Sequence, residues 1–142
     1  MEGKKIPHKM LSLDPFSQWL GIEILESEIG KCKVGMTIRK EMTNSMGKAH
    51  GGIAYSLADT AFGFAVNTNG RFAVSIETSI NHIEALEEGD VIVAEATLES
   101  LKNKVGFYIV EVSRKSKVES HKNELVALFK GVAYRTSKEW ED

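Results

Sequence analysis

Cysteine is almost absent from this sequence, since Cys32 is the only one among 142 residues. A single thiol cannot form a disulfide within the chain, and it cannot supply a cysteine-based metal site. A chain of this length buries roughly 68% of the surface of its unfolded state, so the fold needs no covalent staple. We therefore expect a protein of the reducing, cytoplasmic compartment.

Long apolar runs are also lacking. The longest, residues 53–66, contains Asp59 and falls short of the roughly 20 apolar residues of a membrane-spanning helix. The first residues, MEGKKIPHKML, carry charges and lack the apolar core of a signal peptide. We expect a soluble protein that is neither exported nor bound to a membrane.

Neither sign of charge dominates the chain. It has 18 Lys and Arg against 20 Asp and Glu, a net charge of −2, and no continuous basic stripe. Binding to a nucleic-acid backbone depends on such a stripe. Nucleic acid is therefore not an expected partner.

The first 40 residues are predicted to form one short helix and a strand pair. Asp14 is suited to cap a helix over about 14–20, because Pro15 follows it and Gly21 ends it. Residues 22–40 then alternate between apolar and polar side chains, as in a half-buried strand, with a hairpin turn at Gly30. Cys32 belongs to the apolar side of this alternation, which argues against a cysteine nucleophile.

A long helix is predicted over about 50–67, and only strands follow it. The later strands are rich in Val, Ile, Phe and Tyr and are separated by polar turns; they are 72–84, 90–101, 105–116 and 124–136. Consecutive strands without helical crossovers pair in antiparallel fashion. The expected fold is a single α+β domain, residues 1–142, with one helix on one sheet.

The long helix is apolar on nearly all sides, which is typical of a buried helix. Asp59 lies in its middle, where a charge is costly unless donors or a wet pocket surround it. One interpretation is a structural carboxylate bonded to Thr60, Ser56 or a backbone amide. The other is a functional carboxylate, because perturbed acids gather at active sites.

The helix begins with Gly51 and Gly52, which lower helix propensity. One explanation is a tight turn into the helix. The other is a bare backbone N–H at a helix N-terminus, where partial positive charge is directed outward and suits a ligand oxygen. Taken alone, His50 is typical of a capping or packing histidine, and Asn44 of a loop residue.

The spacing of Gly51 and Asp59 decides how they can cooperate. They are eight residues apart, which is roughly 12 Å along a helix at about 1.5 Å per residue. Reacting atoms must approach within about 3.5 Å, so one carbonyl group cannot contact both residues. If both take part in one reaction, the carboxylate must come from a second copy with an antiparallel helix, as in a two-fold dimer.

These residues resemble the signature of a known family. Asn44, then His50-Gly51-Gly52, then Asp59 within SLADTAFGFA are similar to the motif of the hotdog-fold acyl-CoA thioesterases, in their PaaI-like branch. The likeness extends to VSIETSINHIEALEEGD and to the last strand, ALFKGVAYR. It implies a curled antiparallel sheet wrapped around one central helix, homodimers with a continuous sheet, and association of dimers into tetramers.

The resemblance also implies roles for the signature residues. Gly51 would donate its backbone N–H to the thioester carbonyl, helped by His50. Asp59 of the partner subunit would act as general base on a water or as the nucleophile, and Asn44 would position the substrate or the water. The substrate would be an acyl-CoA, so coenzyme A is part of the substrate and no further cofactor is expected.

Other positions are expected to surround the substrate. Gly52 adjoins the carbonyl site, and Ser75 matches a hydroxyl that some relatives place near the carboxylate. Coenzyme A carries several phosphates, and Lys102 and Lys104 are candidates to contact them. The basic residues of these later strands equally fit an ordinary solvated face.

No metal site is expected, because His8, His82 and His121 have no metal-ligand spacing with carboxylates. No Gly-x-Ser-x-Gly motif occurs, which argues against a serine hydrolase. Two alternatives to thioester hydrolysis stay open. One is a hotdog protein that binds an acyl-CoA or an acyl-carrier protein without hydrolysing it, and the other is a hotdog dehydratase or hydratase.

Overall fold

The computed structural model describes residues 1–142. The helical elements are η1 (Gly3–Lys5), α1 (Ile6–Ser12), α2 (Pro15–Leu20), η2 (Lys40–Met42) and α3 (Gly51–Asn67). The strands are β1 (Glu23–Glu28), β2 (Lys31–Thr37), β3 (Arg71–His82), β4 (Val91–Lys102), β5 (Val105–Arg114) and β6 (Glu124–Glu139). None of the helices is at once long and apolar enough to span a bilayer.

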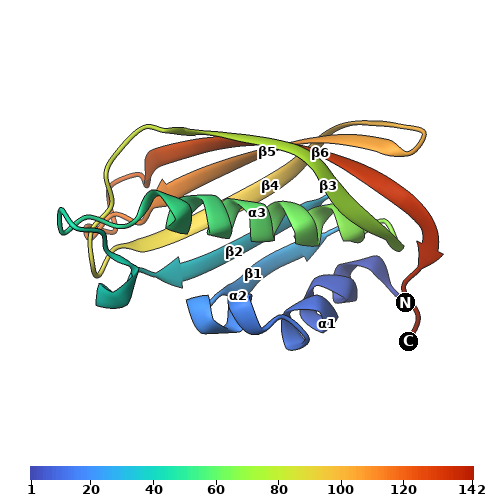
Figure 1. The fold of residues 1–142 in the computed structure, drawn as a ribbon, viewed down its shortest axis with the longest axis horizontal. Helices are drawn as coiled ribbons and strands as arrows, with labels where there is room; N and C mark the ends of the chain where they lie inside the picture. Colours follow the sequence, from blue (N-terminus) through green and yellow to red (C-terminus); the bar gives the residue numbers. More distant parts are fainter.

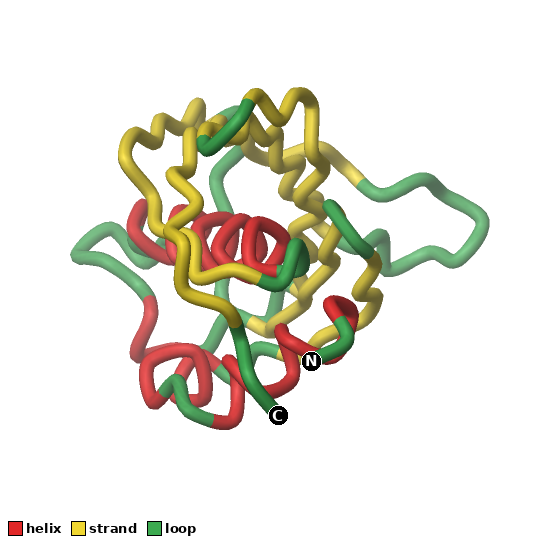
Figure 2. Tube along the Cα trace, turned by 90° about the vertical axis from the view of Figure 1, so that its right-hand side faces the viewer, coloured by secondary structure: helices red, strands yellow, loops and turns green.

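All strands belong to one sheet in the order β1-β2-β4-β5-β6-β3, and every neighbouring pair is antiparallel. The sheet runs along α3 in Figure 1, with α1 and α2 on the other side of the helix. Figure 2 looks along α3 and shows the strands curling around it. The α+β class is thereby confirmed, together with the predicted wrapping of one sheet around one helix.

Small side chains allow α3 to lie close to the sheet. Helix α3 lies against β2 and β4, and its fully buried alanines are Ala58, Ala61 and Ala65. Phe62 packs against Tyr108 and Phe129, with ring centroids 5.7 and 5.8 Å away. A Cβ on Gly131 of β6 would lie only 2.7 Å from the Phe62 ring, so the strand can pass beneath this ring only as glycine.

Helix α3 ends at Asn67, whose buried side chain uses all its hydrogen-bonding groups. Its Nδ2 donates to the carbonyls of Gly63 at 2.7 Å and Ala73 at 3.3 Å. Its Oδ1 accepts from the N–H of Ala73 at 3.0 Å and from the indole N–H of Trp140 at 2.9 Å. Trp140 also stacks on Phe72, with ring centroids 4.1 Å apart. The C-terminal segment is therefore fastened to the end of α3 and to the start of β3.

The elements observed agree with most of the boundaries expected from the sequence. Helix α2 lies where a helix over 14–20 is predicted; the Asp14 side chain accepts from the N–H of Ser17 at 3.0 Å, and Gly21 is left-handed with φ 75°. The strands after α3 end within three residues of the predicted positions.

Helix α1 was not predicted from the sequence. Within it only Ile6 and Pro7 are buried, and this pair is too short to create a helical apolar period.

Candidate active site

The N-terminus of α3 presents a free backbone donor. His50 is the N-cap, and its Nδ1 accepts the N–H of Gly52 at 2.9 Å. The N–H of Ile53 is bonded to the carbonyl of His50 at 2.9 Å. The N–H of Gly51 has no acceptor within the chain. The cap thus uses the amide of Gly52 and leaves that of Gly51 for a group from outside.

Nothing in the fold requires glycine at position 51. The φ angle of Gly51 is not positive, and Gly51 is the first residue of α3. A residue with a side chain could therefore adopt the same backbone conformation. A Cβ there would find its nearest neighbour, His82 Nε2, at 3.9 Å, which is ordinary van der Waals contact. Gly52 is more constrained, because a Cβ there would lie 3.1 Å from His50 Nδ1. The tight-turn explanation therefore does not hold for Gly51.

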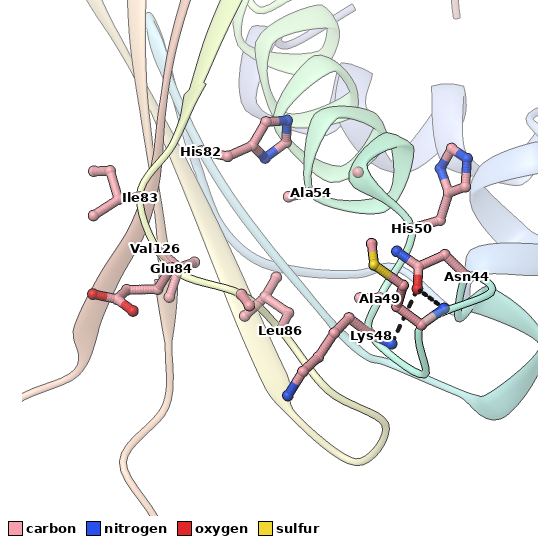
Figure 3. A pocket seen from close by; sticks show the side chains of 13 residues that line it. Asn44, Lys48, Ala49, His50, Ala54, His82, Ile83, Glu84, Leu86 and Val126 are labelled. Carbon is pink, nitrogen blue, oxygen red and sulfur yellow. Dashed lines mark hydrogen bonds between the residues drawn. The ribbon is translucent and has the colours of Figure 1, made fainter.

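Gly51 opens into a cavity of about 380 Å³, which we call the Gly51 hollow. Figure 3 shows its walls: the loop before α3, the first turn of α3, and the segment that follows β3. His50 and His82 lie on opposite sides of the first turn of α3 in this view. Ala54, Leu86 and Val126 supply an apolar part of the wall. The hollow combines an unpaired N–H with an apolar lining, as small-molecule sites commonly do.

Asn44 organises the loop that forms one side of the Gly51 hollow. Its Oδ1 accepts from the backbone N–H groups of Met46 at 2.9 Å and Lys48 at 3.2 Å (Figure 3). Its backbone N–H also donates to the carbonyl of Lys48 at 2.7 Å. The side-chain Nδ2 has no acceptor in the chain, so Asn44 keeps both of its amide hydrogens for a ligand.

Asp59 lies in a separate cavity of about 250 Å³, the Asp59 hollow, between α3 and the two N-terminal helices. Met10, Phe16 and Tyr55 contribute apolar surface to it. The Asp59 carboxylate is half-buried and accepts no hydrogen bond, and desolvation raises its pKa. A half-buried acid that lacks both a donor and a cation is suited to accept a proton.

A structural role for Asp59 would require a hydrogen bond from Ser56, Thr60 or a backbone amide, and none of these bonds is present. The Ser56 hydroxyl donates to the carbonyl of Gly52 at 2.7 Å. The Thr60 hydroxyl lies 3.5 Å from that of Ser17. Neither hydroxyl bonds to the Asp59 carboxylate, and no backbone amide donates to it.

The predicted site residues divide between the two hollows. Asn44, His50 and Gly51 line one, whereas Asp59 lines the other. Within one chain the free amide and the carboxylate therefore do not share a cavity. This separation agrees with the distance expected from their positions along the helix.

The remaining predicted residues lie outside both hollows. Gly52 is occupied by the cap, and Ser75 is exposed on β3 at a break in its pairing with β6. Lys102 and Lys104 flank the turn between β4 and β5, at the end of the sheet opposite to the start of α3 (Figure 1).

Sequence reasoning missed His82 and the segment after it. His82 is the last residue of β3, and the strand was predicted to continue to residue 84. The chain instead leaves the sheet there and forms a wall of the hollow. A bond from the N–H of Ala49 to the carbonyl of Leu86, at 2.8 Å, and an ion pair of Lys48 with Glu87 hold this wall to the loop before α3. The Glu-Glu-Gly-Asp turn that follows could have indicated an earlier strand end.

Comparison with known proteins decides the family of this chain. Residues 46–120 match the family model described as the thioesterase superfamily. A protein named putative esterase from Archaeoglobus fulgidus is 38% identical over 137 residues, which cover 96% of this chain and 85% of the relative. The chain belongs to the thioesterase superfamily.

Two further similarities place this thioesterase in the PaaI-like branch. The acyl-coenzyme A thioesterase PaaI of Escherichia coli is 33% identical over 128 residues, which cover 90% of this chain and 87% of the relative. The solved structure of the E. coli PaaI protein from the phenylacetic acid degradation operon superimposes with a TM-score of 0.88 at 31% identity, covering 97% of this chain and 96% of that one. The predicted hotdog fold and the predicted family are confirmed, and the chain is a thioester hydrolase by family.

Proposed function

We propose that this thioesterase hydrolyses acyl-CoA thioesters to a free acid and coenzyme A. The observation that carries the proposal is Gly51: its N–H is unbonded, its backbone is compatible with any residue, and a methyl group would fit. Glycine at such a position is explained by a ligand atom that must approach the amide. The likeness to an E. coli protein named acyl-coenzyme A thioesterase favours a thioester carbonyl as that ligand.

The chemistry proposed at Gly51 is stabilisation of an oxyanion. When hydroxide adds to the thioester carbon, negative charge develops on the carbonyl oxygen, and the Gly51 N–H donates to it. The positive end of α3 adds to this effect. In comparable acyl-transfer sites, removal of one such donor costs about 2.7 to 4 kcal/mol of transition-state stabilisation.

The proposed base is Asp59 of the partner subunit. Its carboxylate takes a proton from a water molecule while the water oxygen bonds to the thioester carbon. The carbon–sulfur bond then breaks, and coenzyme A leaves as its thiol after it gains that proton. Asn44, with an unbonded Nδ2, would hold the water or the substrate, and His50 would act by ordering the first turn of α3.

A two-fold dimer is supported by the free edge of the sheet. Strand β3 runs from Arg71 to His82 and pairs only with β6, so its other edge carries unpaired backbone groups. Val74 and Ile76 on this strand are 54% and 59% exposed. A long, partly apolar edge is covered in most proteins. If two β3 strands pair about a two-fold axis, the two α3 helices run antiparallel, as shared use of Gly51 and Asp59 requires.

The experiment with most power over this proposal is a mixing assay. Gly51→Val blocks the amide, and Asp59→Ala removes the base, so we expect each variant alone to release little thiol from a panel of acyl-CoAs. A mixed dimer has one site that lacks both groups and one intact site. After unfolding and refolding together in equal amounts, we expect about a quarter of the wild-type rate.

Three results would contradict parts of the proposal. If the mixture stays inactive although mixed dimers form, the two residues do not share a site across subunits. If the wild type releases no thiol from any acyl-CoA but binds them, the non-hydrolytic interpretation takes over. Turnover of enoyl-CoA to its hydrated product would favour the hydratase. The mass of the particle in solution tests the dimer, and also the tetramer that the family resemblance predicts.

A further inference from the structure

A second polar cavity lies on the other side of the wall that bounds the Gly51 hollow. It encloses about 610 Å³ between the segment 87–91 and the β5–β6 connection, residues 115–123. Its lining is almost entirely polar, with Val91 as the one apolar residue. We call it the basic hollow, because of the charges described next.

The acidic residues that line the basic hollow all take part in ion pairs. Asp90 and Glu124 both bind the guanidinium of Arg114, with N–O distances of 3.1 and 2.5 Å. Glu87 is paired with Lys48. The cations that remain carry no ion pair within the chain; they are Lys115, Lys117 and Lys122.

The exposed Glu119 lies on the same connection without lining the hollow. Arg114 offsets only one of the two charges of Asp90 and Glu124, but the three lysines still leave the lining of the hollow with a net positive charge. Such a lining suits a ligand with several negative charges.

The basic hollow and the Gly51 hollow share a wall. The segment 82–86 lines the Gly51 hollow, and its continuation from Glu87 to Val91 lines the basic hollow. Arg114 ties the two together, since its Nη1 donates to the carbonyl of Ala85 at 3.1 Å. The Lys115 N–H donates to the carbonyl of Val91 at 2.8 Å, which fixes the first lysine at the mouth. The segments that line the two cavities lie at the end of the sheet where α3 begins (Figure 1).

We propose that Lys115, Lys117 and Lys122 bind the phosphate groups of the nucleotide end of the acyl-CoA. The inference rests on the proposed function and assigns the part of the substrate that lies farthest from the reacting carbonyl. The pantetheine arm would cross the shared wall from the Gly51 hollow to the basic hollow. The lining has no Phe, Trp or Tyr, and His121 is its one ring-bearing side chain, so recognition depends more on the phosphates than on the adenine ring.

The alternative set of cations, Lys102 and Lys104, lies at the opposite end of the sheet of the same chain. These lysines could reach a substrate held at Gly51 only from a partner subunit. Lys104 also lies over the ring of Tyr134, with its Nζ 5.9 Å from the centroid. The two sets of lysines would therefore place the phosphate groups of the same substrate at opposite ends of the sheet.

The test compares the triple variant Lys115→Gln, Lys117→Gln, Lys122→Gln with the wild type on two thioesters of one acyl group. One is the acyl-CoA, and the other is the acyl-N-acetylcysteamine thioester, which has no nucleotide. We expect KM for the acyl-CoA to rise roughly 5- to 30-fold with kcat unchanged, since each exposed ion pair contributes modestly. KM for the truncated thioester should not change.

A matched control removes the same charge elsewhere. Lys4, Lys5 and Lys33 are on η1 and β2, outside the basic hollow, and pair only with Glu2 and Glu26. Changing all of them to Gln should leave KM as in the wild type. Calorimetry with adenosine 3′,5′-bisphosphate gives a second measurement that needs no turnover: we expect binding to the wild type and to the control, and weakened binding to the triple variant.

Each remaining outcome separates the inference from the proposed function. If neither thioester is hydrolysed by the wild type, the proposed function fails, and the calorimetry alone decides the basic hollow. If KM of the triple variant equals that of the control, the basic hollow does not bind the nucleotide. A rise of KM in Lys102→Gln, Lys104→Gln with none in the triple variant would assign the phosphates to the other end of the sheet. A defect limited to thioesters of an acidic carrier protein would make the hollow a protein-docking site and overturn the inference.

Discussion

Helix α3 carries two short polar side chains of almost equal size, Asp59 and Asn67, and the fold treats them in opposite ways. Asn67 is 3% exposed, and its oxygen and nitrogen take part in four hydrogen bonds. Asp59 is only half-buried, yet it receives no hydrogen bond, and its pKa is raised by desolvation. The side chain that is more deeply buried is thus the one whose hydrogen-bonding groups all have partners.

This difference is the one expected between a structural polar residue and the proposed functional one. Burial of a polar group is tolerable when its partners are built into the chain, and Asn67 meets that condition. An acid that is partly desolvated without partners lowers stability and is retained for another reason. Asn67 therefore stabilises the fold, whereas the environment of Asp59 is the one expected of the proposed base.

The largest expected effect tests the Asp59 side of this comparison. Asp59→Asn keeps the shape of the side chain but removes the base, so we expect kcat for acyl-CoA hydrolysis to fall about 10²- to 10⁴-fold. Thermal unfolding should show no loss of stability, because no hydrogen bond is broken. An active Asp59→Asn variant would remove the distinction between the two residues.

The next effect tests the Asn67 side. Asn67→Ala removes four hydrogen bonds and leaves buried partners unsatisfied, among them the indole of Trp140. We expect the free energy of unfolding to fall by about 2 to 4 kcal/mol, measured by urea denaturation. The kcat of the folded fraction should equal that of the wild type. A catalytic loss without a loss of stability would contradict the structural role.

A smaller effect is expected at the start of the same helix. His50→Ala removes the acceptor for the Gly52 N–H, and loss of an N-cap costs about 0.5 to 2 kcal/mol. His50→Asn retains a capping oxygen and serves as the matched control. If both variants lose activity equally while only the alanine variant loses stability, the imidazole acts on the substrate as well as on the helix.

The smallest effect concerns pH. Because the folded state raises the pKa of Asp59, folding favours the protonated acid, and this contribution is fully present below the unfolded pKa near 3.8. It is lost as pH rises through the folded pKa. We therefore expect Asp59→Asn to be more stable than the wild type at pH 7, with the gap closing toward pH 4. For Asn67→Ala the loss of stability should not depend on pH in this way.

The sequence alone predicts the fold well where the pattern is long. The apolar run of α3 and the alternation of the strands define their elements because each period repeats several times. Helix α1 is too short to repeat, and so it was missed. The sequence also reveals Asp59 and Gly51. An acid is unexpected in the middle of an apolar helix, and glycine is unexpected in a helix because it lowers helix propensity.

Other features depend on contacts between distant segments. The partners of Asn67 come from Ala73 and Trp140, and no local pattern connects these positions. His82 reaches the Gly51 hollow only because the chain leaves the sheet at that residue. The grouping of Lys115, Lys117 and Lys122 beside the same end of α3 follows from the pairing of β4 with β5, which a single sequence does not specify.

The burial of Cys32 determines how cleanly this enzyme can be assayed. Its side chain is fully enclosed in the core, and desolvation raises the pKa of the thiol to about 12. At neutral pH the sulfur is protonated and out of contact with solvent, so thiol-specific dyes and mild oxidants have nothing to modify on the native protein. Colour that develops with a disulfide reagent will therefore report released coenzyme A alone, and a slow rise without substrate will report unfolding.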